Sequence, residues 1–401
     1  MAENLADLHE SVMNNPFSAK IRIRLPVQAE IEVFLKGLLQ EEPGLLKECE
    51  VDPAVLASKL VGLSRVNIKN MVFYAFHNQK PITLKYVSQV KKEIIEKEAF
   101  GRLDFIESKK SLNDVAGHEA AKQWLREDAQ LIKQGAAAAL PMGYLITGRI
   151  GTGKTYLVEC FAGECGIPVV AIRNFREKWV GVTEGNLEKI FQILHALEQV
   201  VVFVDEADQL TGRRGGGEGD AGLSGRIYGM LAKEMANTEN RGKILWIFAT
   251  SRPDLLEVDL KRQGRLDVHI PLFPPETPEE VSALFLAMAK KVGLPLKAED
   301  LPELKFHEPV SGNELEGILI RALREYKLRQ GQAGGDLATI LQNVIQEFRP
   351  SAHQLQLEYM DLLAVKECTD QRFLPKRFLE MDPSEIDSRL EELKGILLIG
   401  G

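Results

Sequence analysis

The sequence has little of what marks several classes of protein. Its four cysteines are scattered without paired spacing, so they indicate neither a disulfide framework nor a cysteine-ligated metal site. No apolar run reaches the ~18 residues that a membrane-spanning helix needs, and no signal peptide opens the chain. Basic residues are not in excess: the formal net charge is −8 at pH 7. Because phosphate backbones favour basic surfaces, nucleic acid is disfavoured as a partner. Without an apolar run or a signal peptide, we expect a cytoplasmic protein that makes no contact with a membrane.

The 401 residues divide into four regions by pattern. Residues 1–105 are mainly helical, and residues 106–275 alternate helical stretches with five short strands that are almost entirely apolar. Such strands are typical of a parallel sheet that is covered on both faces. Residues 276–348 are helical again, and residues 349–401 form a helical tail. The predicted fold is α/β: a parallel five-stranded sheet, then a helical lid, with a mainly helical domain before them.

The first and third regions resemble each other. A strand, a proline break and an amphipathic helix in "AKIRIRLPVQAEIEVFLKGLL" recur in "LDVHIPLFPPETPEEVSALFLAMAKK". Two further helical stretches match in the same order at a nearly constant offset of about 250 residues, as in a duplicated unit. We predict that residues 1–105 are a degenerate copy of the lid. An unrelated helical domain is the alternative, since amphipathic helices resemble one another.

The stretch "GRIGTGKT" (148–155) lies between an apolar strand and a helical segment, and it fits the G-x-x-x-x-G-K-[ST] pattern of a phosphate-binding loop. Glycines let backbone N–H groups close around phosphate oxygens, and the positive end of the helix favours the anion. Lys154 would reach the β- and γ-phosphates of ATP, and the Thr155 hydroxyl would hold Mg²⁺. The predicted nucleotide-binding residues of this P-loop NTPase are Gly148, Gly151, Thr152, Gly153, Lys154, Thr155 and Tyr156.

Two further strands end in polar residues. "VVVFVDEAD" (200–208) places Asp205 at the carboxyl edge of the sheet, where ligands of open α/β sheets bind and where Asp205 can hold Mg²⁺. Glu206 follows and can orient and deprotonate the water that attacks the γ-phosphate. In "IFATSRPD" (247–254), the hydroxyl of Ser251 is placed to contact the γ-phosphate or that water.

The stretch "DLKRQGRLD" (259–267) holds Arg262 and Arg265 with no acid between them. An arginine that stabilises charge on a transferred phosphoryl group can be supplied by another molecule. If subunits pack head to tail, Arg262 of one subunit faces the nucleotide of its neighbour, and a closed ring follows. The alternative is that both arginines pair with surface carboxylates.

Taken together, "DVAG", "GRIGTGKT", "VVVFVDEAD", "FATSRPD" and "DLKRQGRLD" resemble the ordered motifs of AAA+ ATPases. The group in question includes segregases, membrane-anchored proteases and chloroplast and cyanobacterial ATPases. The resemblance implies a hexameric homo-oligomer with Arg262 and Arg265 acting in trans and Ser251 as the first sensor. It also implies that the base of the nucleotide lies near Val115, Ala116, Gly312 and Asn313.

Four positions depart from the family pattern. Arg149 and Ile150 stand where the phosphate loop usually has two prolines, Ser251 stands where asparagine is usual, and Gln263 replaces a proline. None of these changes removes a group that the chemistry needs, but the shorter Ser251 side chain is expected to slow hydrolysis.

The stretch "KWVGVTEGN" (178–186) matches the place where the family has a pore loop. Trp179, Val180 and Gly181 would project into the ring and grip an extended polypeptide, because a rigid aromatic ring packs against any sequence. We therefore predict an ATPase that uses ATP and Mg²⁺ to remodel, unfold or thread a protein substrate. The alternatives are an assembly or scaffold component with slow hydrolysis and, less favoured, a motor that acts on nucleic acid.

Overall fold

The computed structural model describes most of the chain. The described residues are 25–42, 44, 51–98, 103–172, 184–197, 199–211, 218–306, 308–329, 336–350 and 352–399. Most of the strand predicted in "AKIRIRLP" lies outside these ranges, as do all three predicted pore-loop residues, Trp179, Val180 and Gly181.

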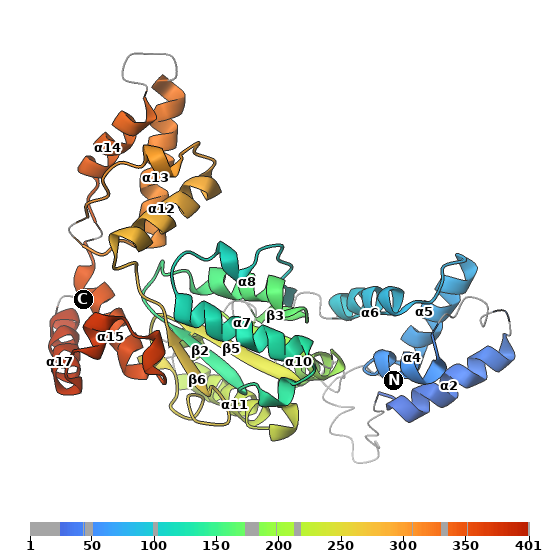
Figure 1. Cartoon of the computed structure of the whole chain (residues 1–401). Coiled ribbons are helices and arrows are strands. Elements are labelled where there is room, and N and C mark those ends of the chain that lie inside the picture. Colours follow the sequence, from blue (N-terminus) through green and yellow to red (C-terminus); the bar gives the residue numbers. More distant parts are fainter. Residues whose placement is uncertain are drawn as a thin grey trace.

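A six-stranded sheet forms the centre of the molecule, in the order β1-β3-β4-β5-β2-β6 (Figure 1). All neighbouring pairs among its last five strands are parallel, which confirms the predicted sheet. These strands are β2 (Gly143–Thr147), β3 (Val169–Ile172), β4 (Val200–Val204), β5 (Ile244–Thr250) and β6 (Val268–Pro271). The additional strand β1 (Asp104–Phe105) pairs antiparallel with β3. Two residues are too few to show a hydrophobic pattern, so β1 was not predicted.

Helices cover both faces of the sheet, which explains why its strands are apolar on both sides. Along β2, Leu145 packs into one hydrophobic cluster while Tyr144 and Ile146 pack into another. The clusters also contain residues of the covering helices α7 (Glu119–Lys133), α8 (Lys154–Cys165), α10 (Glu184–Ala196) and α11 (Glu218–Met235). Side chains that alternate along a strand face opposite sides of a sheet, so both faces of β2 are buried.

The N-terminal region is helical, as predicted, and packs on the sheet domain. Its helices are α2 (Gln28–Glu41), α4 (Pro53–Leu60), α5 (Arg65–His77) and α6 (Leu84–Glu98). Ser64 caps α5, because its hydroxyl accepts a hydrogen bond from the backbone N–H of Asn67 at 3.1 Å. At Gly62 (φ +91°), a Cβ atom would lie 2.5 Å from Cα of Ala196 at the end of α10. Backbone of the N-terminal region and backbone of the sheet domain are therefore in direct contact.

The lid and the tail follow the sheet and have hydrophobic clusters of their own. The lid contains α12 (Pro278–Val292), α13 (Gly312–Arg329) and α14 (Leu337–Glu347), and the tail contains α15 (Gln354–Glu367), α16 (Lys376–Leu379) and α17 (Pro383–Ile399). The tail cluster includes Phe273, which comes just after β6 and packs against Phe378, with the rings tilted and 4.9 Å between their centroids. The domain limits given above stay a prediction.

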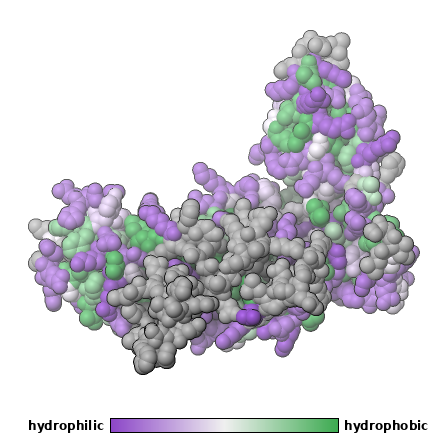
Figure 2. Space-filling view, turned by 180° about the vertical axis from the view of Figure 1, so that it is seen from behind, coloured by the Kyte–Doolittle hydropathy of each residue, from purple (hydrophilic) through white to green (hydrophobic). Residues whose placement is uncertain are grey.

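The coloured surface of the lid and tail is largely hydrophilic, with smaller hydrophobic areas between the polar side chains (Figure 2). Among the described residues, none of the helices combines the length and the hydrophobicity that a bilayer crossing requires.

Candidate nucleotide-binding site

The phosphate loop turns sharply between β2 and α8, and its glycines are required by geometry. At Gly148 (φ +134°), a Cβ atom would lie 2.1 Å from the backbone oxygen of Leu272. At Gly151 (φ +86°), it would lie 3.0 Å from Oγ of Ser311 in the lid. Gly153 precedes the first residue of α8 and leaves the positive end of that helix open toward the loop. This arrangement suits the phosphates of a nucleotide.

Lys154 lies inside the loop and is partly buried. Its ammonium group donates hydrogen bonds to the backbone oxygens of Gly148 (2.7 Å) and Arg149 (3.0 Å). Burial lowers the pKa of Lys154 to about 8, and the nearby carboxylates, Asp205 foremost, oppose that shift. The ammonium is therefore close to its pKa at mildly alkaline pH, and a bound phosphate would favour its charged form.

This pKa predicts a pH dependence of nucleotide binding. Lys154 is charged below pH 8 and becomes neutral above it, so raising the pH from 7 to 9 should weaken ADP binding by up to about ten-fold. Binding at pH 8 should also take up protons from the buffer. Isothermal titration calorimetry in buffers of different ionisation enthalpy measures both effects. An affinity that stays constant from pH 7 to pH 9 would contradict the role of Lys154.

Asp205 and Thr155 meet at the carboxyl edge of the sheet. The Thr155 hydroxyl donates a hydrogen bond to Oδ2 of Asp205 at 2.8 Å, which joins the first turn of α8 to the end of β4. A hydroxyl and a carboxylate at this separation are oxygen ligands of the kind that Mg²⁺ takes beside a nucleotide. The two predicted metal-binding side chains therefore fit a shared magnesium ion.

Glu206 has an unusual backbone conformation. Its φ of +49° lies in the left-handed region, which is uncommon for residues other than glycine and is often found at functional sites. The Glu206 N–H donates to Oδ1 of Asp205 at 3.0 Å, and the Gln209 side-chain amide donates to Oε2 of Glu206 at 2.5 Å. The Glu206 side chain is exposed beside the phosphate loop, where a water molecule can reach it.

Ser251 follows β5, the strand between β4 and β2, so the three strands bring Asp205, Gly148 and Ser251 to one edge of the sheet. The preceding residue, Thr250, is fully buried, and its hydroxyl donates to Oδ1 of Asp208 at 2.6 Å. This bond was not predicted from the sequence, and it ties the end of β5 to the acidic segment after β4.

The residues predicted near the base converge on the loop from two sides. The Gly312 N–H at the start of α13 donates to the backbone oxygen of Gly151 at 3.1 Å, and Gly151 also approaches Asn313. Val115 is buried and Ala116 half-buried in the segment before α7. This segment reaches the loop through His118, whose Nε2 lies 3.3 Å from the backbone oxygen of Thr152. Tyr156 is half-buried in α8 under the ammonium of Lys110, 4.5 Å from the ring centroid.

Arg262 and Arg265 lie at the opposite edge of the sheet. A Cβ atom on Gly143, at the amino end of β2, would lie 2.8 Å from the backbone oxygen of Arg265. The phosphate loop is at the other end of β2, about 15 Å away at the usual rise per residue. Both guanidinium groups pair with Asp259: Arg262 at 2.9 Å, and Arg265 with the carboxylate as well as the backbone oxygen. Arg262 remains 69% exposed, whereas Arg265 is 16% exposed.

One pair of charged residues at the loop was not predicted. Arg149 is buried, and so is Asp361 in the tail helix α15. The Nε atom of Arg149 lies 3.5 Å from Oδ2 of Asp361. From the sequence, Arg149 stood out only as a departure from proline. A signal for Asp361 existed, since it is the one acid within the apolar stretch "YMDLLAV".

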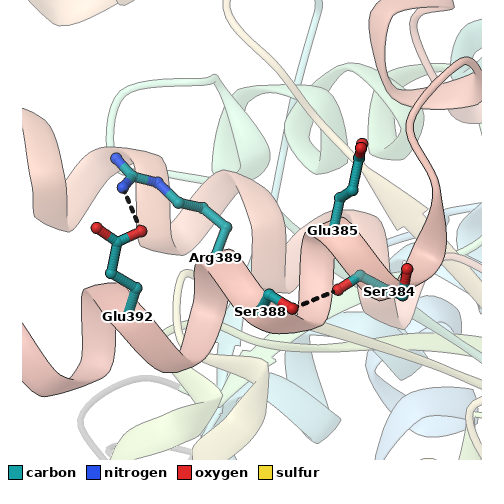
Figure 3. Close-up of a pocket in the computed structure, with 5 residues that line it drawn as sticks. All are labelled: Ser384, Glu385, Ser388, Arg389 and Glu392. Carbon is teal, nitrogen blue, oxygen red and sulfur yellow. Dashed lines mark hydrogen bonds and ion pairs between the residues drawn. The ribbon is translucent and has the colours of Figure 1, made fainter.

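A hollow of about 340 Å³ lies along α17 and is lined by Ser384, Glu385, Ser388, Arg389 and Glu392 (Figure 3). Its polar groups are engaged with the protein: Ser388 donates to the backbone oxygen of Ser384 at 2.8 Å, and Arg389 pairs with Glu392 at 2.7 Å. It is open to solvent and lies on a different element from the predicted catalytic residues, so we assign it no part in the site.

Two protein-family models match this chain. Residues 144–273 match the model described as "ATPase family associated with various cellular activities (AAA)", and residues 31–100 match "AAA+ chaperone, second helical domain". The fold, the site and the first match together show an AAA domain built around a phosphate loop over residues 144–273. The second match shows that residues 31–100 are similar to a helical domain of AAA+ chaperones, and their origin as a copy of the lid stays a prediction.

Individual relatives agree with this assignment. The chain is 27% identical over 347 residues to "Cell division cycle protein 48 homolog" of Archaeoglobus fulgidus, which covers 79% of the chain and 47% of the relative. It is 30% identical over 260 residues to "ATP-dependent zinc metalloprotease FtsH 2" of Salinibacter ruber. That alignment covers 62% of the chain and 36% of the relative. The chain therefore spans less than half the length of these two relatives. The crystal structure of the FIGL-1 AAA domain in complex with ADP matches 70% of the chain and 98% of that domain, with a TM-score of 0.52 and 21% identity, and so shows the fold.

Proposed function

We propose that the protein hydrolyses ATP with Mg²⁺ and uses the energy to remodel, unfold or thread a protein substrate. The observation that carries this proposal is the convergence of Lys154, Thr155, Asp205 and Glu206 at one edge of the sheet, with the Thr155–Asp205 bond of 2.8 Å at its centre. Phosphoryl transfer depends mainly on positioning and on the stabilisation of negative charge, and this edge supplies both.

Each residue has a distinct role in this proposal. Lys154 leaves the loop carbonyls and binds the β- and γ-phosphates, while Thr155 and Asp205 hold the metal ion. Bound Mg²⁺ would neutralise charge on the phosphate oxygens. Glu206 orients the attacking water and accepts its proton, and Ser251 lies on the neighbouring strand end, where its hydroxyl can reach the same region.

A neighbouring subunit supplies the missing arginine. Arg262 and Arg265 lie a strand length away from the phosphate loop of their own chain, so they cannot reach its γ-phosphate. The more exposed Arg262 is the one able to reach a neighbour, and Arg265, which binds the backbone of its own turn at Asp259, holds that turn in shape. Head-to-tail contacts of this kind close into a ring, for which we propose six subunits.

The proposed pore loop predicts a separation of hydrolysis from work. Trp179→Ala should leave basal ATP hydrolysis within about two-fold of wild type, because the proposed role of Trp179 is to grip substrate and not to bind nucleotide, and it should abolish stimulation by an unfolded polypeptide such as casein. A steady-state ATPase assay with and without casein measures this, with Trp124→Phe in α7, which packs against Phe373, as an aromatic control. If the Trp179 variant is stimulated as strongly as wild type, the pore-loop assignment fails.

A second function is favoured by Ser251. Where the family usually has an asparagine, this chain has a shorter side chain without an amide, which reduces the groups available to orient water. A ring that assembles on ATP and hydrolyses it slowly would serve as a scaffold rather than a motor. In that case casein would leave the hydrolysis rate of the wild type unchanged.

A further inference from the structure

A buried ion pair joins the phosphate loop to the C-terminal tail. The side chains of Arg149 and Asp361 are 3% and 9% exposed, and the Nε to Oδ2 distance is 3.5 Å. Within the described part of the chain, Nε and Nη2 of Arg149 and Oδ1 of Asp361 have no hydrogen-bond partner. Burying two charges with incomplete hydrogen bonding opposes stability, and apolar residues of similar volume would do as well or better. Stabilisation of the fold is therefore a poor explanation for this pair.

The backbone of Arg149 is part of the anion-binding loop. Its carbonyl oxygen accepts one hydrogen bond from the Thr152 hydroxyl and another from the Lys154 ammonium, each at 3.0 Å. A displacement of residue 149 would thus move two neighbouring groups of the loop. Because the Arg149 side chain pairs with Asp361 of α15, the packing of α15 bears on the position of residue 149.

The helix that carries Asp361 also contacts two other segments of the sheet domain: the one that contains Ser251 and the turn that contains Arg262. The Arg252 guanidinium, next to Ser251, lies 5.4 Å from the ring centroid of Tyr359. At the end of α15, Glu367 pairs with Lys261, which precedes Arg262 and donates to the backbone oxygen of Pro253 at 3.1 Å. A movement of α15 would therefore be felt at the phosphate loop, at the first-sensor segment and at the arginine turn.

We propose that Asp361 is a positioning residue for nucleotide binding, which acts through Arg149 and couples the docking of α15 to the occupancy of the phosphate loop. This inference rests on the proposed function, in that the loop binds a nucleotide. Without Asp361, the Arg149 guanidinium would lose its nearest counter-charge, with only the weaker influence of Glu314 and Glu308 remaining, and its displacement would take the carbonyl of residue 149 out of the loop. A guanidinium displaced into water would also attract the phosphates of the nucleotide, but water and salt screen that attraction. The distortion of the loop should therefore dominate, and nucleotide binding should weaken.

Coupling between two sites is reciprocal. If docking of α15 strengthens nucleotide binding, then bound nucleotide must strengthen docking of α15 by the same factor. This gives a readout that a purely structural role of Asp361 would not produce: protection of the tail helix by a ligand that it does not contact.

The test compares the full chain with its Asp361→Asn and Asp387→Asn variants. Asp387 is the matched control, because it pairs with Lys366 of the same helix α15 but is 59% exposed. Binding of ADP with Mg²⁺ should weaken by about 5- to 100-fold in Asp361→Asn, the usual range of coupling between sites, and stay unchanged in Asp387→Asn. Hydrogen exchange over residues 354–367 should slow on adding Mg·ADP in the wild type and control, and not in Asp361→Asn.

If Asp361→Asn does not fold, a pH titration decides. Burial raises the pKa of Asp361 to about 6, against the opposing charges of Arg149, Arg377 and Lys154, while Glu276 acts in the same direction as burial. Acidification below pH 6 neutralises the carboxylate, so the wild-type affinity for Mg·ADP should fall more steeply than that of an Arg149→Leu, Asp361→Leu double variant. Such an apolar pair is expected to fold.

Parallel pH curves, or an Asp361→Asn variant that binds as wild type does, would overturn the inference while leaving the proposed function intact. A wild-type chain that binds no Mg·ADP would instead overturn the proposed function.

Discussion

Replacing Glu206 with Gln should stop ATP hydrolysis while ATP stays bound. The substitution keeps the size of the side chain and its hydrogen bonds but removes the carboxylate that accepts a proton from water. Loss of a general base lowers a rate by about 10²- to 10⁴-fold. The left-handed backbone of Glu206 is unaffected, so the geometry of the site is preserved. The measurement is a single-turnover assay with radiolabelled ATP, alongside equilibrium binding of ATP to the same variant.

Lys154→Ala supplies the contrasting control for this experiment. Removing the ammonium should abolish nucleotide binding itself, so the two variants are both inactive for different reasons. A Glu206→Gln protein that turns over ATP at the wild-type rate would exclude Glu206 as the base. The base would then be sought among the neighbouring acids. Asp208 is one of these, and it already accepts a hydrogen bond from the Thr250 hydroxyl.

The second large effect concerns Arg262. An arginine supplied in trans contributes about 10³- to 10⁵-fold to phosphoryl transfer, so Arg262→Ala should lower hydrolysis by a factor in that range with little change in ATP affinity. Mixing Arg262→Ala chains with Glu206→Gln chains should restore activity. An interface is active when an intact Glu206 on one chain meets an intact Arg262 on the next, which holds for about a quarter of the interfaces in a random equimolar ring.

The mixture separates the two explanations of the arginine turn. Restored hydrolysis means that the turn of one chain completes the site of another, as its position at the far edge of the sheet requires. A mixture that remains inactive, although both variants fold and bind ATP, would return Arg262 to the alternative in which it only pairs with Asp259 on its own surface.

Much of the fold and site could be predicted because the signals are local. Each of the five parallel strands is a short apolar run, and the glycines and Lys154 of the phosphate loop occupy fixed positions in a motif that needs their backbone and charge. Position along the chain also placed Asp205 and Ser251 at strand ends, and parallel strands end at a common edge.

What could not be predicted depends on contacts between distant segments. The sequence shows Arg149 and Asp361 far apart, and only the packing of α15 against the loop brings them to 3.5 Å. Likewise, Asp259 was visible as the first residue of the arginine stretch, but the turn that folds its carboxylate back onto both guanidinium groups follows from tertiary structure. Strand β1 has no pattern of its own and exists because β3 offers an edge.

The contact between Gly62 and Ala196 has a consequence for how the molecule unfolds. Residues of the N-terminal helices and of one sheet face belong to a single continuous hydrophobic cluster, whereas the lid has a cluster of its own. Elements that share a core open together, and elements with separate cores can open one at a time. We therefore expect the N-terminal helices to unfold together with the sheet domain, and the helices α12, α13 and α14 to open separately from it.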